Sequence, residues 1–230
     1  MSLSVVVPVW RDAPAVARLL ASHPSSPAEW IVVSVDDPDE DAALTPVLAA
    51  APHVRWVRRR RGRGPQQNAG AAAAHGEWLL FLHADSSLPE GWLDEIRYAA
   101  TRARPYGWGC FRFALDSDAW QARLLERVVA LRVRLGRLPY GDQGIFLRRD
   151  VFQSTGGFPP YPLMEDVALV RRLSAHGPPY RSPLPLRTSA RRWQQDGWLR
   201  RSLRNLSVLA RYMFGVPPER LVRPYERPRD

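Results

Sequence analysis

An imidazole and a carboxylate follow directly after one of the most apolar segments of the sequence. In the stretch GEWLLFLHADSSLP, the apolar residues 78–82 are followed by His83, Ala84 and Asp85. An apolar run of this length, bounded by polar residues, is typical of a buried strand. Because such a strand holds the residues at its end rigidly, we expect Asp85 to lie at the mouth of a ligand-binding crevice.

A second acidic pair, Glu165 and Asp166, stands in the first turn of a helix expected over residues 164–177. Carboxylates at this position have an ordinary structural explanation, because they complement the positive end of the helix dipole by about 0.3–1 kcal/mol. The functional interpretation gains weight because Asp85 already places one carboxylate at the crevice. A second acid facing the same crevice would suit proton transfer.

Arginines gather just before the helix expected at residues 66–76. Residues 58–61 are all arginine, and Arg63 follows Gly62. An arginine beside a helix N-terminus, which carries its own partial positive charge, suits a diphosphate. Residues 58–61 are explained equally well as a solvated face, so Arg63 is the better candidate. No glycine follows the first strand, and the GRG at 62–64 lacks the Walker spacing, which argues against dinucleotide and P-loop sites.

Short apolar strands alternate with helical segments through the first half of the chain. This pattern predicts an α/β fold with a mostly parallel, Rossmann-like sheet flanked by helices. Ligands bind such sheets at the carboxyl ends of the strands, where Asp36 and Asp37 also lie. The second half is less regular. Strands are expected at 3–10, 29–37, 53–59, 77–85, 107–115 and 144–152, and helices at 13–22, 41–50, 66–76, 90–102, 119–135 and 164–177.

The composition excludes several classes of protein. The 230 residues are 45% hydrophobic, which excludes global disorder, and the single cysteine, Cys110, excludes a disulfide framework. No apolar run approaches the roughly 18 residues that span a bilayer, and no signal peptide is apparent, so a cytoplasmic location is expected. The net charge of +10 attracts anions: nucleic acid, an acidic membrane face or phosphorylated small molecules.

Several motifs occur in order along the chain: SVVVPVW, VDD, GRGPQQNAGAAAAHGEWLLFLHADSSLP, GDQGIFLRRDVFQSTGGFP and PLMEDVALVRRL. Together they resemble the family-two inverting glycosyltransferases with the GT-A fold, and most of all a small bacterial branch that carries FLHAD and MED. The resemblance covers nearly all of residues 2–225. It implies a metal-dependent enzyme that moves a sugar from a nucleotide-diphosphate sugar to an acceptor hydroxyl with inversion.

The resemblance also implies roles for individual residues. Asp85 matches the aspartate that binds a divalent cation, Mg²⁺ or Mn²⁺, while His83 replaces the first acid of the family pattern. Asp166 matches the catalytic base, with Glu165 as its orienting neighbour. Contacts to the nucleotide sugar are implied for Pro8, Val9, Asp36, Asp37, Arg63, Asn68 and Ala84, and acceptor-side positions for Asp142, Gln143, Arg192 and Trp193.

Some of these assignments keep a structural alternative. A tight polar turn would explain Asp142 and Gln143 equally well. His83 either binds the metal or hydrogen-bonds the nearby backbone, and the second role is favoured because Asp85 alone matches the ligand position. Residues 189–193 are similar to the QxxRW element of processive relatives, with Ser189 in place of glutamine.

The expected domain organisation has two parts. Residues 1–193 form the GT-A domain, with a nucleotide-binding half at 1–102 and an acceptor-side half at 103–193. Residues 194–230 form a basic amphipathic helical extension. Its apolar face either lies in a membrane interface or packs back on the domain. Membrane contact would place the protein at the inner face of the membrane and favour a lipid-linked acceptor.

A rival hypothesis from another class is a non-catalytic protein that binds membranes or nucleic acid on a glycosyltransferase-like scaffold. The charge of +10 and the altered metal motif at His83 favour it. No recognised nucleic-acid-binding motif accompanies the arginines, so no nucleic-acid partner is expected. The sequence does not indicate the sugar, the acceptor or the oligomeric state.

Overall fold

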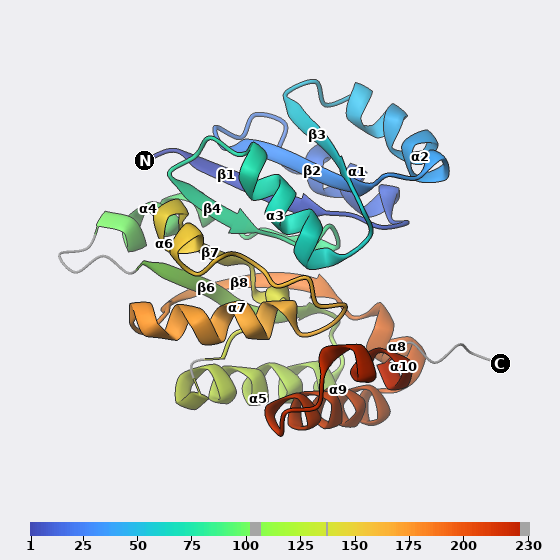
Figure 1. The fold of residues 1–230 in the computed structure, drawn as a ribbon, viewed down its shortest axis with the longest axis vertical. Coiled ribbons are helices and arrows are strands. Elements are labelled where there is room, and N and C mark those ends of the chain that lie inside the picture. Colours follow the sequence, from blue (N-terminus) through green and yellow to red (C-terminus); the bar gives the residue numbers. More distant parts are fainter. Residues whose placement is uncertain (102–106, 137, 226–230) are drawn as a thin grey trace.

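The structure is a computed structural model in which residues 1–101, 107–136 and 138–225 are described. One eight-stranded sheet, in the order β3-β2-β1-β4-β7-β6-β8-β5, runs through the molecule (Figure 1). Its strands are β1 (Leu3–Pro8), β2 (Glu29–Val35), β3 (Val54–Arg59), β4 (Trp78–Phe81), β5 (Ser86–Ser87), β6 (Trp108–Asp116), β7 (Ile145–Arg148) and β8 (Tyr180–Ser189).

Helices cover both faces of this sheet and one end of the molecule (Figure 1). Within the described residues they are α1 (Ala13–Ala21), α2 (Pro38–Ala49), α3 (Arg63–Ala73), α4 (Trp92–Thr101), α5 (Trp120–Gly136), α6 (Arg149–Ser154), α7 (Glu165–Leu173), α8 (Arg191–Asp196), α9 (Trp198–Met213) and α10 (Pro218–Tyr225), with short 3-10 turns η1 (Gly141–Gln143) and η2 (Ser174–His176).

The first four strands confirm the predicted parallel arrangement. β1 lies between β2 and β4 and runs parallel to both, and β2 runs parallel to β3. Val5, Val6 and Val7 of β1 are fully buried, as expected for a strand covered on both faces. The carboxyl ends of β1, β2 and β4 therefore meet at one edge of the sheet.

The second half of the sheet is mixed. β7 lies between β4 and β6 and is antiparallel to both, whereas β8 is parallel to β6 and antiparallel to β5. β8 is not expected from the sequence, because its prolines and arginines hide the apolar pattern. The pairing of β6 with β8 is irregular between Cys110 and Arg112, opposite the segment that contains Pro183. Proline cannot donate to the ladder, which accounts for the break.

One expected strand is wrong in its second part. Residues 144–152 were expected to be extended, but β7 ends at Arg148 and α6 begins at Arg149. Asp150 accepts a hydrogen bond from the backbone N–H of Val151 in the first turn of this helix, 2.8 Å away. The apolar Phe152 is buried from the helix and packs against Phe81 and Phe158.

Two helices begin earlier than expected. α2 begins at Pro38 because Asp37 caps it, accepting hydrogen bonds from Asp39 N and Glu40 N. α3 begins at Arg63 and ends at Ala73, before Gly76. A Cβ on Gly76 would lie 2.6 Å from Ser4 N, so the chain there runs too close to β1 for a side chain.

The helix expected at 90–102 is α4. Residue 102 and the boundary between the two expected halves of the GT-A domain lie outside the described residues.

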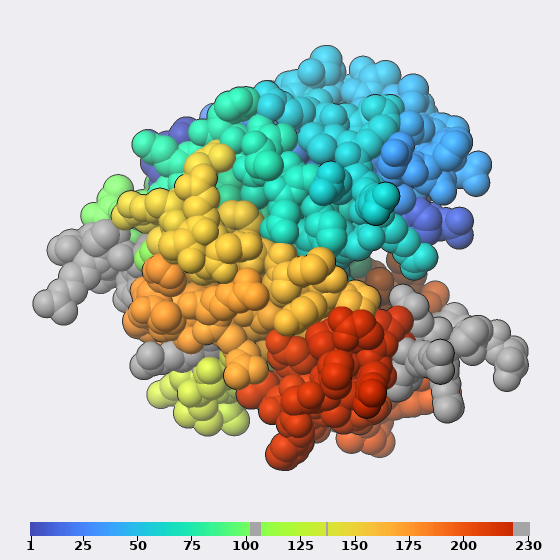
Figure 2. Space-filling model, viewed as in Figure 1, coloured from blue at the N-terminus to red at the C-terminus, as the bar shows by residue number. Residues whose placement is uncertain are grey.

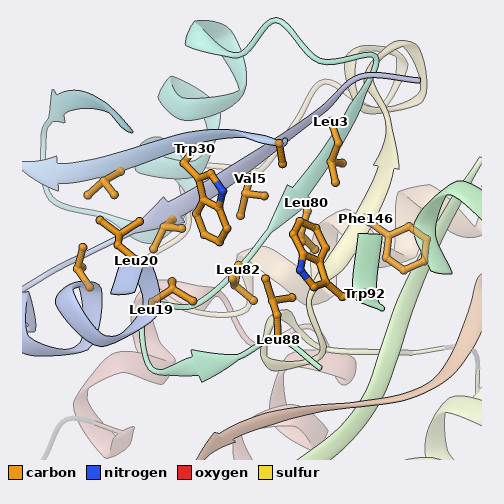
Figure 3. Close-up of a cluster of buried hydrophobic side chains, with 14 of the residues drawn as sticks. Leu3, Val5, Leu19, Leu20, Trp30, Leu80, Leu82, Leu88, Trp92 and Phe146 are labelled. Carbon is orange, nitrogen blue, oxygen red and sulfur yellow. The ribbon is translucent and has the colours of Figure 1, made fainter. Parts of the chain in front are cut away.

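The two faces of the sheet have separate cores. On one face, α1, α2 and α4 pack on the apolar side chains of β1, β2 and β4, with Trp30 and Trp92 in edge contact (Figure 3). On the other face, α3, α6 and α7 pack on Val6, Ile31 and Phe81. A Cβ on Gly70 of α3 would lie 2.3 Å from Val6, so this glycine sets how close the helix lies to the sheet.

The last helices lie at the end of the molecule beside α5 (Figure 1). α5 packs on β6 through Ala122, Val129 and Val133. The expected domain boundary after residue 193 falls inside α8, and the division into domains stays a prediction. None of the helices in the described ranges combines the length and the apolar character needed to cross a bilayer.

Candidate functional site

The motif with His83 and Asp85 occupies a turn after β4 and not the strand itself. Leu82 N still donates to Val6 O at 3.0 Å, and Ser86 N then donates to His83 O at 3.1 Å. The chain therefore leaves the sheet beside the end of β1. This places His83, Ala84 and Asp85 at the carboxyl edge of the parallel strands, as the sequence predicts.

The start of α7 fixes the carboxylate of Asp166. Met164, just before the helix, has a left-handed backbone with φ of 67°. One oxygen of Asp166, Oδ2, accepts a hydrogen bond from Gly141 N at 2.8 Å, and Oδ1 accepts one from Val167 N at 2.8 Å. Two backbone donors thus orient the carboxylate and leave further lone pairs on both oxygens.

Gly141 is the point where the two predicted motifs meet. A Cβ on this residue would lie 3.1 Å from His83 Nε2 and 3.2 Å from Asp166 Oδ2. The absence of a side chain lets the imidazole of one motif and the carboxylate of the other approach the same short segment. Residues 83 and 166, far apart in the sequence, are therefore neighbours in the fold.

Arg63 links the same two motifs from a third element, the start of α3. Its Nε lies 2.9 Å from Glu165 Oε1, and its Nη1 lies 3.4 Å from His83 Nε2. Gly64 permits this arrangement, because a Cβ there would lie 2.6 Å from Pro159 O and 3.5 Å from Glu165 Cβ. Burial raises the pKa of Glu165, and the charge of Arg63 opposes that rise. Glu165 therefore positions Arg63.

His83 is a neutral imidazole at pH 7. Burial, together with the positive charges of Arg63 and Arg192, lowers its pKa to about 3. The contact from Arg63 Nη1 is satisfied when His83 Nε2 accepts, which assigns the ring proton to Nδ1. Burial also raises the pKa of Asp85, and Arg192 opposes this change. Arg192, exposed at the start of α8, thus acts electrostatically on both residues of the turn.

A third carboxylate, that of Asp142, completes an acidic group. Burial raises the pKa of Asp142 to about 6, Arg132 opposes this rise, and the negative charges of Asp166 and Asp85 reinforce it. Its Oδ1 is buried and accepts no hydrogen bond from the described residues. Carboxylates that repel one another in this way are a suitable environment for a divalent cation.

The described residues do not form a complete set of metal ligands by themselves. Among the described residues, no group of three or more His, Cys, Asp or Glu side chains could hold a metal ion. The carboxylate of Asp85 lies near two further negative charges, those of Asp142 and Asp166, and its role as a metal ligand stays a prediction. Such a site fits Mg²⁺ or Mn²⁺ that is completed by the oxygens of a bound phosphate and by water.

A hollow of about 340 Å³ lies beside this group, between α1 and β8. Ala84 and Asp85 line it, together with Asp12, Arg187 and Arg191. Asp166 does not line this hollow, although the sequence predicts that Asp85 and Asp166 face a shared cavity. The connection between the two is electrostatic, because both carboxylates raise the pKa of Asp142.

The predicted residues at the ends of β1 and β2 differ in their surroundings. Val9 is buried in the core and its N–H donates to Val33 O at 2.9 Å, next to the half-buried Pro8. The carboxylate of Asp37 is engaged in capping α2. Asp36 is exposed, and its backbone N–H is bonded to Arg59 O at 3.0 Å. Asp36 is therefore the residue of this group that presents a carboxylate to solvent.

Three predicted site residues make contacts within the fold, and their binding roles stay predictions. Both ends of the Asn68 amide bond the backbone of Phe158, at 2.8 and 2.9 Å. Gln143 is buried, and its Nε2 donates to Phe111 O at 3.2 Å. Trp193 packs near Phe113.

Other residues that shape the site are not indicated by the sequence. Gln66 is buried and its Nε2 donates to Val9 O and Val33 O, at 2.9 and 2.8 Å, so it joins the ends of β1 and β2. The guanidinium groups of Arg11 and Arg61 lie over the ring of Trp10. The arginine run was a signal for the second contact, whereas nothing in the sequence distinguishes Gln66 from its neighbour Gln67.

Comparison with known proteins assigns this chain to a family. The model of glycosyl transferase family 2 matches residues 4–158. The succinoglycan biosynthesis protein ExoO of Rhizobium meliloti (strain 1021) is 31% identical over 163 residues, which cover 68% of this chain and 45% of that protein. The match to the family model confirms the predicted resemblance, because it covers more than half of the chain.

Solved structures share the fold. The mannosyltransferase PcManGT from Pyrobaculum calidifontis, in complex with GDP-Man and Mn²⁺, has a TM-score of 0.58 at 16% identity, over 80% of this chain and 56% of that one. S. aureus TarS 1–349 has a TM-score of 0.62 at 15% identity, over 83% of this chain and 61% of that one. This chain thus spans about half the length of these relatives. The predicted GT-A fold is confirmed, and the chain belongs to glycosyl transferase family 2.

Proposed function

We propose that this protein transfers a sugar from a nucleotide-diphosphate sugar to an acceptor hydroxyl, with inversion at the anomeric carbon and with Asp166 as the general base. The observation that carries the proposal is the position of Asp166. Its carboxylate is held by the N–H groups of Gly141 and Val167 beside the metal motif of His83 and Asp85. A base in fixed geometry contributes roughly 10²–10⁴-fold to such a reaction.

The leaving diphosphate needs positive charge. Arg63 and Arg192 supply it, since both guanidinium groups act on His83 at the carboxyl edge of the sheet. A Mg²⁺ or Mn²⁺ held by Asp85 would further neutralise the diphosphate as a Lewis acid. The Mn²⁺ in the mannosyltransferase structure supports a divalent cation in this fold. His83 is paired with Arg63, which favours an orienting role over a ligand role.

The reaction then follows from the arrangement of charges. Asp166 accepts the proton of the acceptor hydroxyl, whose oxygen forms the new bond to the anomeric carbon. The bond from that carbon to the diphosphate oxygen breaks, and the electron pair leaves with the diphosphate. Attack from the side opposite the leaving group inverts the configuration. Asp142, next to Asp166, faces the acceptor side in this scheme.

The donor is a nucleotide sugar, as the complexes of PcManGT with GDP-Man and of TarS with UDP suggest. Trp10 with its arginines and the exposed Asp36 are suited to the nucleoside, because both lie at the ends of the parallel strands. We further propose a lipid-linked acceptor and a location at the inner face of the membrane. The exposed apolar side chains Leu199, Leu203 and Leu206 of α9 support both proposals.

The test separates the base from the metal ligand. We expect Asp166→Asn to lower the rate of nucleotide-sugar turnover by about 10²–10⁴-fold, because the amide cannot accept the proton. The variant should keep the thermal stabilisation by UDP or GDP with Mn²⁺, whereas Asp85→Ala should lose it. Asp94→Asn, at an exposed carboxylate on α4, is the control. Full activity of Asp166→Asn would refute the assigned mechanism.

A further inference from the structure

Helix α5 carries two apolar faces. The face toward β6 buries Ala122, Val129 and Val133. At about 100° per residue, a second set of side chains projects in roughly the opposite direction. A surface helix ordinarily has a polar outer face, so this pattern needs an explanation. The outer set consists of Trp120, Leu124, Val128, Leu131 and Leu135, which are 69%, 51%, 56%, 55% and 74% exposed.

Helix α9 repeats the arrangement. Its inner face is marked by the buried residues Arg201 and Val208. Its outer face again consists of large apolar side chains at helical spacing, and the residue after the helix, Phe214, is 90% exposed. The other outer residues are Leu199, Leu203, Leu206 and Met213, which are 72%, 55%, 61% and 48% exposed.

The two helices belong to one part of the surface. Figure 1 shows them along the same end of the molecule, and Trp198 of α9 packs in the same cluster as Ala122 of α5. Of the twelve large hydrophobic side chains exposed in the described residues, ten lie on these two outer faces. We call these ten residues the α5–α9 face. A concentration of this kind marks an interaction surface.

The charge of the two helices is strongly positive. Together their sequences contain eight arginines and one glutamate. Arg127, Arg134, Arg200 and Arg211 are exposed on the helices that carry the apolar residues. Apolar side chains that include tryptophan and phenylalanine, flanked by arginine, are the pattern of helices that lie in the interface of an acidic membrane.

We propose that the α5–α9 face binds the surface of a bilayer that contains anionic lipids. The charge decides between this occupant and a second copy of the chain. A symmetric dimer would bring the same arginine-rich helices against each other, whereas anionic head groups neutralise them. The apolar side chains then enter the boundary between head groups and acyl chains, and the arginines remain at the head groups.

The same helices contact the segments that form the catalytic group. Val208 of α9 packs in one cluster with Leu163 and Met164, directly before Glu165, and Figure 2 shows the C-terminal helices (red) against this segment (yellow to orange). Arg132 of α5 stacks on Tyr140, next to Gly141. If the proposed function holds, on which this step rests, the bilayer lies beside the base and the acceptor hydroxyl is carried by a membrane lipid.

Sedimentation with vesicles tests the proposal. We expect the wild-type chain to sediment with vesicles of phosphatidylglycerol and phosphatidylcholine, and much less with phosphatidylcholine alone. Leu124→Gln with Leu131→Gln on α5, and Leu203→Gln with Leu206→Gln on α9, should each weaken binding by roughly tenfold, because each pair removes two apolar contacts with the interface. The four changes together should bring it to background.

Two further measurements make the result decisive. Tyr98→Gln, at a half-exposed side chain on α4 outside this face, is the matched control and should bind vesicles like the wild type. Thermal stabilisation by UDP or GDP with Mn²⁺ should persist in the fourfold variant, because the α5–α9 face does not bind the nucleotide. Absence of this stabilisation in the wild type would count against the proposed function and leave the vesicle result unaffected. Wild-type vesicle binding by the fourfold variant overturns the proposal. So does a wild-type dimer that binds no vesicles and dissociates on the same substitutions.

Discussion

Carboxylates at the two ends of the parallel strands have their pKa values shifted in opposite directions. At the amino ends, Glu29 accepts hydrogen bonds from the Ser4 hydroxyl and from the backbone and ring of His75. Burial opposes its charge, but these hydrogen bonds outweigh burial and lower the pKa of Glu29 to about 2. At the carboxyl ends, the pKa values of Asp85 and Asp142 are raised instead.

The difference separates Glu29, whose carboxylate stabilises the fold, from Asp85 and Asp142, whose carboxylates are suited to binding a ligand. Glu29 finds its partners within the chain, so its charge stabilises the native state. Asp142 is partly buried next to other acids, and its buried oxygen Oδ1 accepts no hydrogen bond from the described residues. Such a group lowers stability unless a ligand compensates for its charge, which is typical of binding and catalytic sites.

Among the substitutions that test this comparison, the largest effect is expected at Gly141, where the two motifs meet. In Gly141→Ala the new Cβ would lie 3.1 Å from His83 Nε2 and 3.2 Å from Asp166 Oδ2, so one of them must move by a few tenths of an ångström. Because the base must be accurately placed, we expect nucleotide-sugar turnover to fall by roughly ten- to a hundredfold while the melting temperature changes little.

Gly136→Ala is the control for this substitution, since its Cβ would lie 3.8 Å from Leu138, an ordinary contact distance. Unchanged turnover in Gly141→Ala would show that His83 and Asp166 need not be closely positioned. The close placement of side chains at the carboxyl ends of the strands would then have no role in catalysis.

A smaller effect, on stability, is expected from Asp142→Asn. The pKa of Asp142 in the folded state, about 6, lies above the ordinary value of 3.8. The wild type therefore loses stability as the pH rises from about 4 through 6, and the variant does not. At pH 7 without metal we expect the variant to be more stable by roughly 1–3 kcal/mol, with the difference vanishing below about pH 4.

Urea unfolding in the presence of a chelator, repeated across this pH range, measures the difference. Asp94→Asn again serves as the control, because that carboxylate is 81% exposed. If Asp142→Asn is less stable than the wild type at pH 7, the carboxylate of Asp142 stabilises the fold and is not held ready for a ligand.

An effect on stability of the opposite sign is expected from Glu29→Gln. The folded-state pKa of about 2 lies below the ordinary value of 4.5, so Glu29 contributes stability above about pH 4.5 that is lost as the pH falls toward 2. The variant should be less stable than the wild type at pH 7, and the gap should shrink at pH 3. A constant gap across this range would mean that the charge of Glu29 has no part in the effect.

The sequence predicted the first half of the fold well, and the reason is physical. Strands β1, β2 and β4 are buried on both faces, so burial and hydrophobicity coincide along each of them. β8 is different, because Pro183, Pro185 and its arginines belong to a strand whose partners are β6 and β5. Only the pairing with those strands makes this segment extended, and no local pattern reveals it.

For the candidate site, the sequence by itself determined which residue types stand at the strand ends and at the start of α7. It supplied Asp85, Arg63, Glu165 and Asp166 as candidates, because each follows or precedes a recognisable element. The tertiary structure alone decided which of them meet. Gly141 brings His83 and Asp166 together, since contacts between distant segments depend on how the elements pack and not on their spacing along the chain.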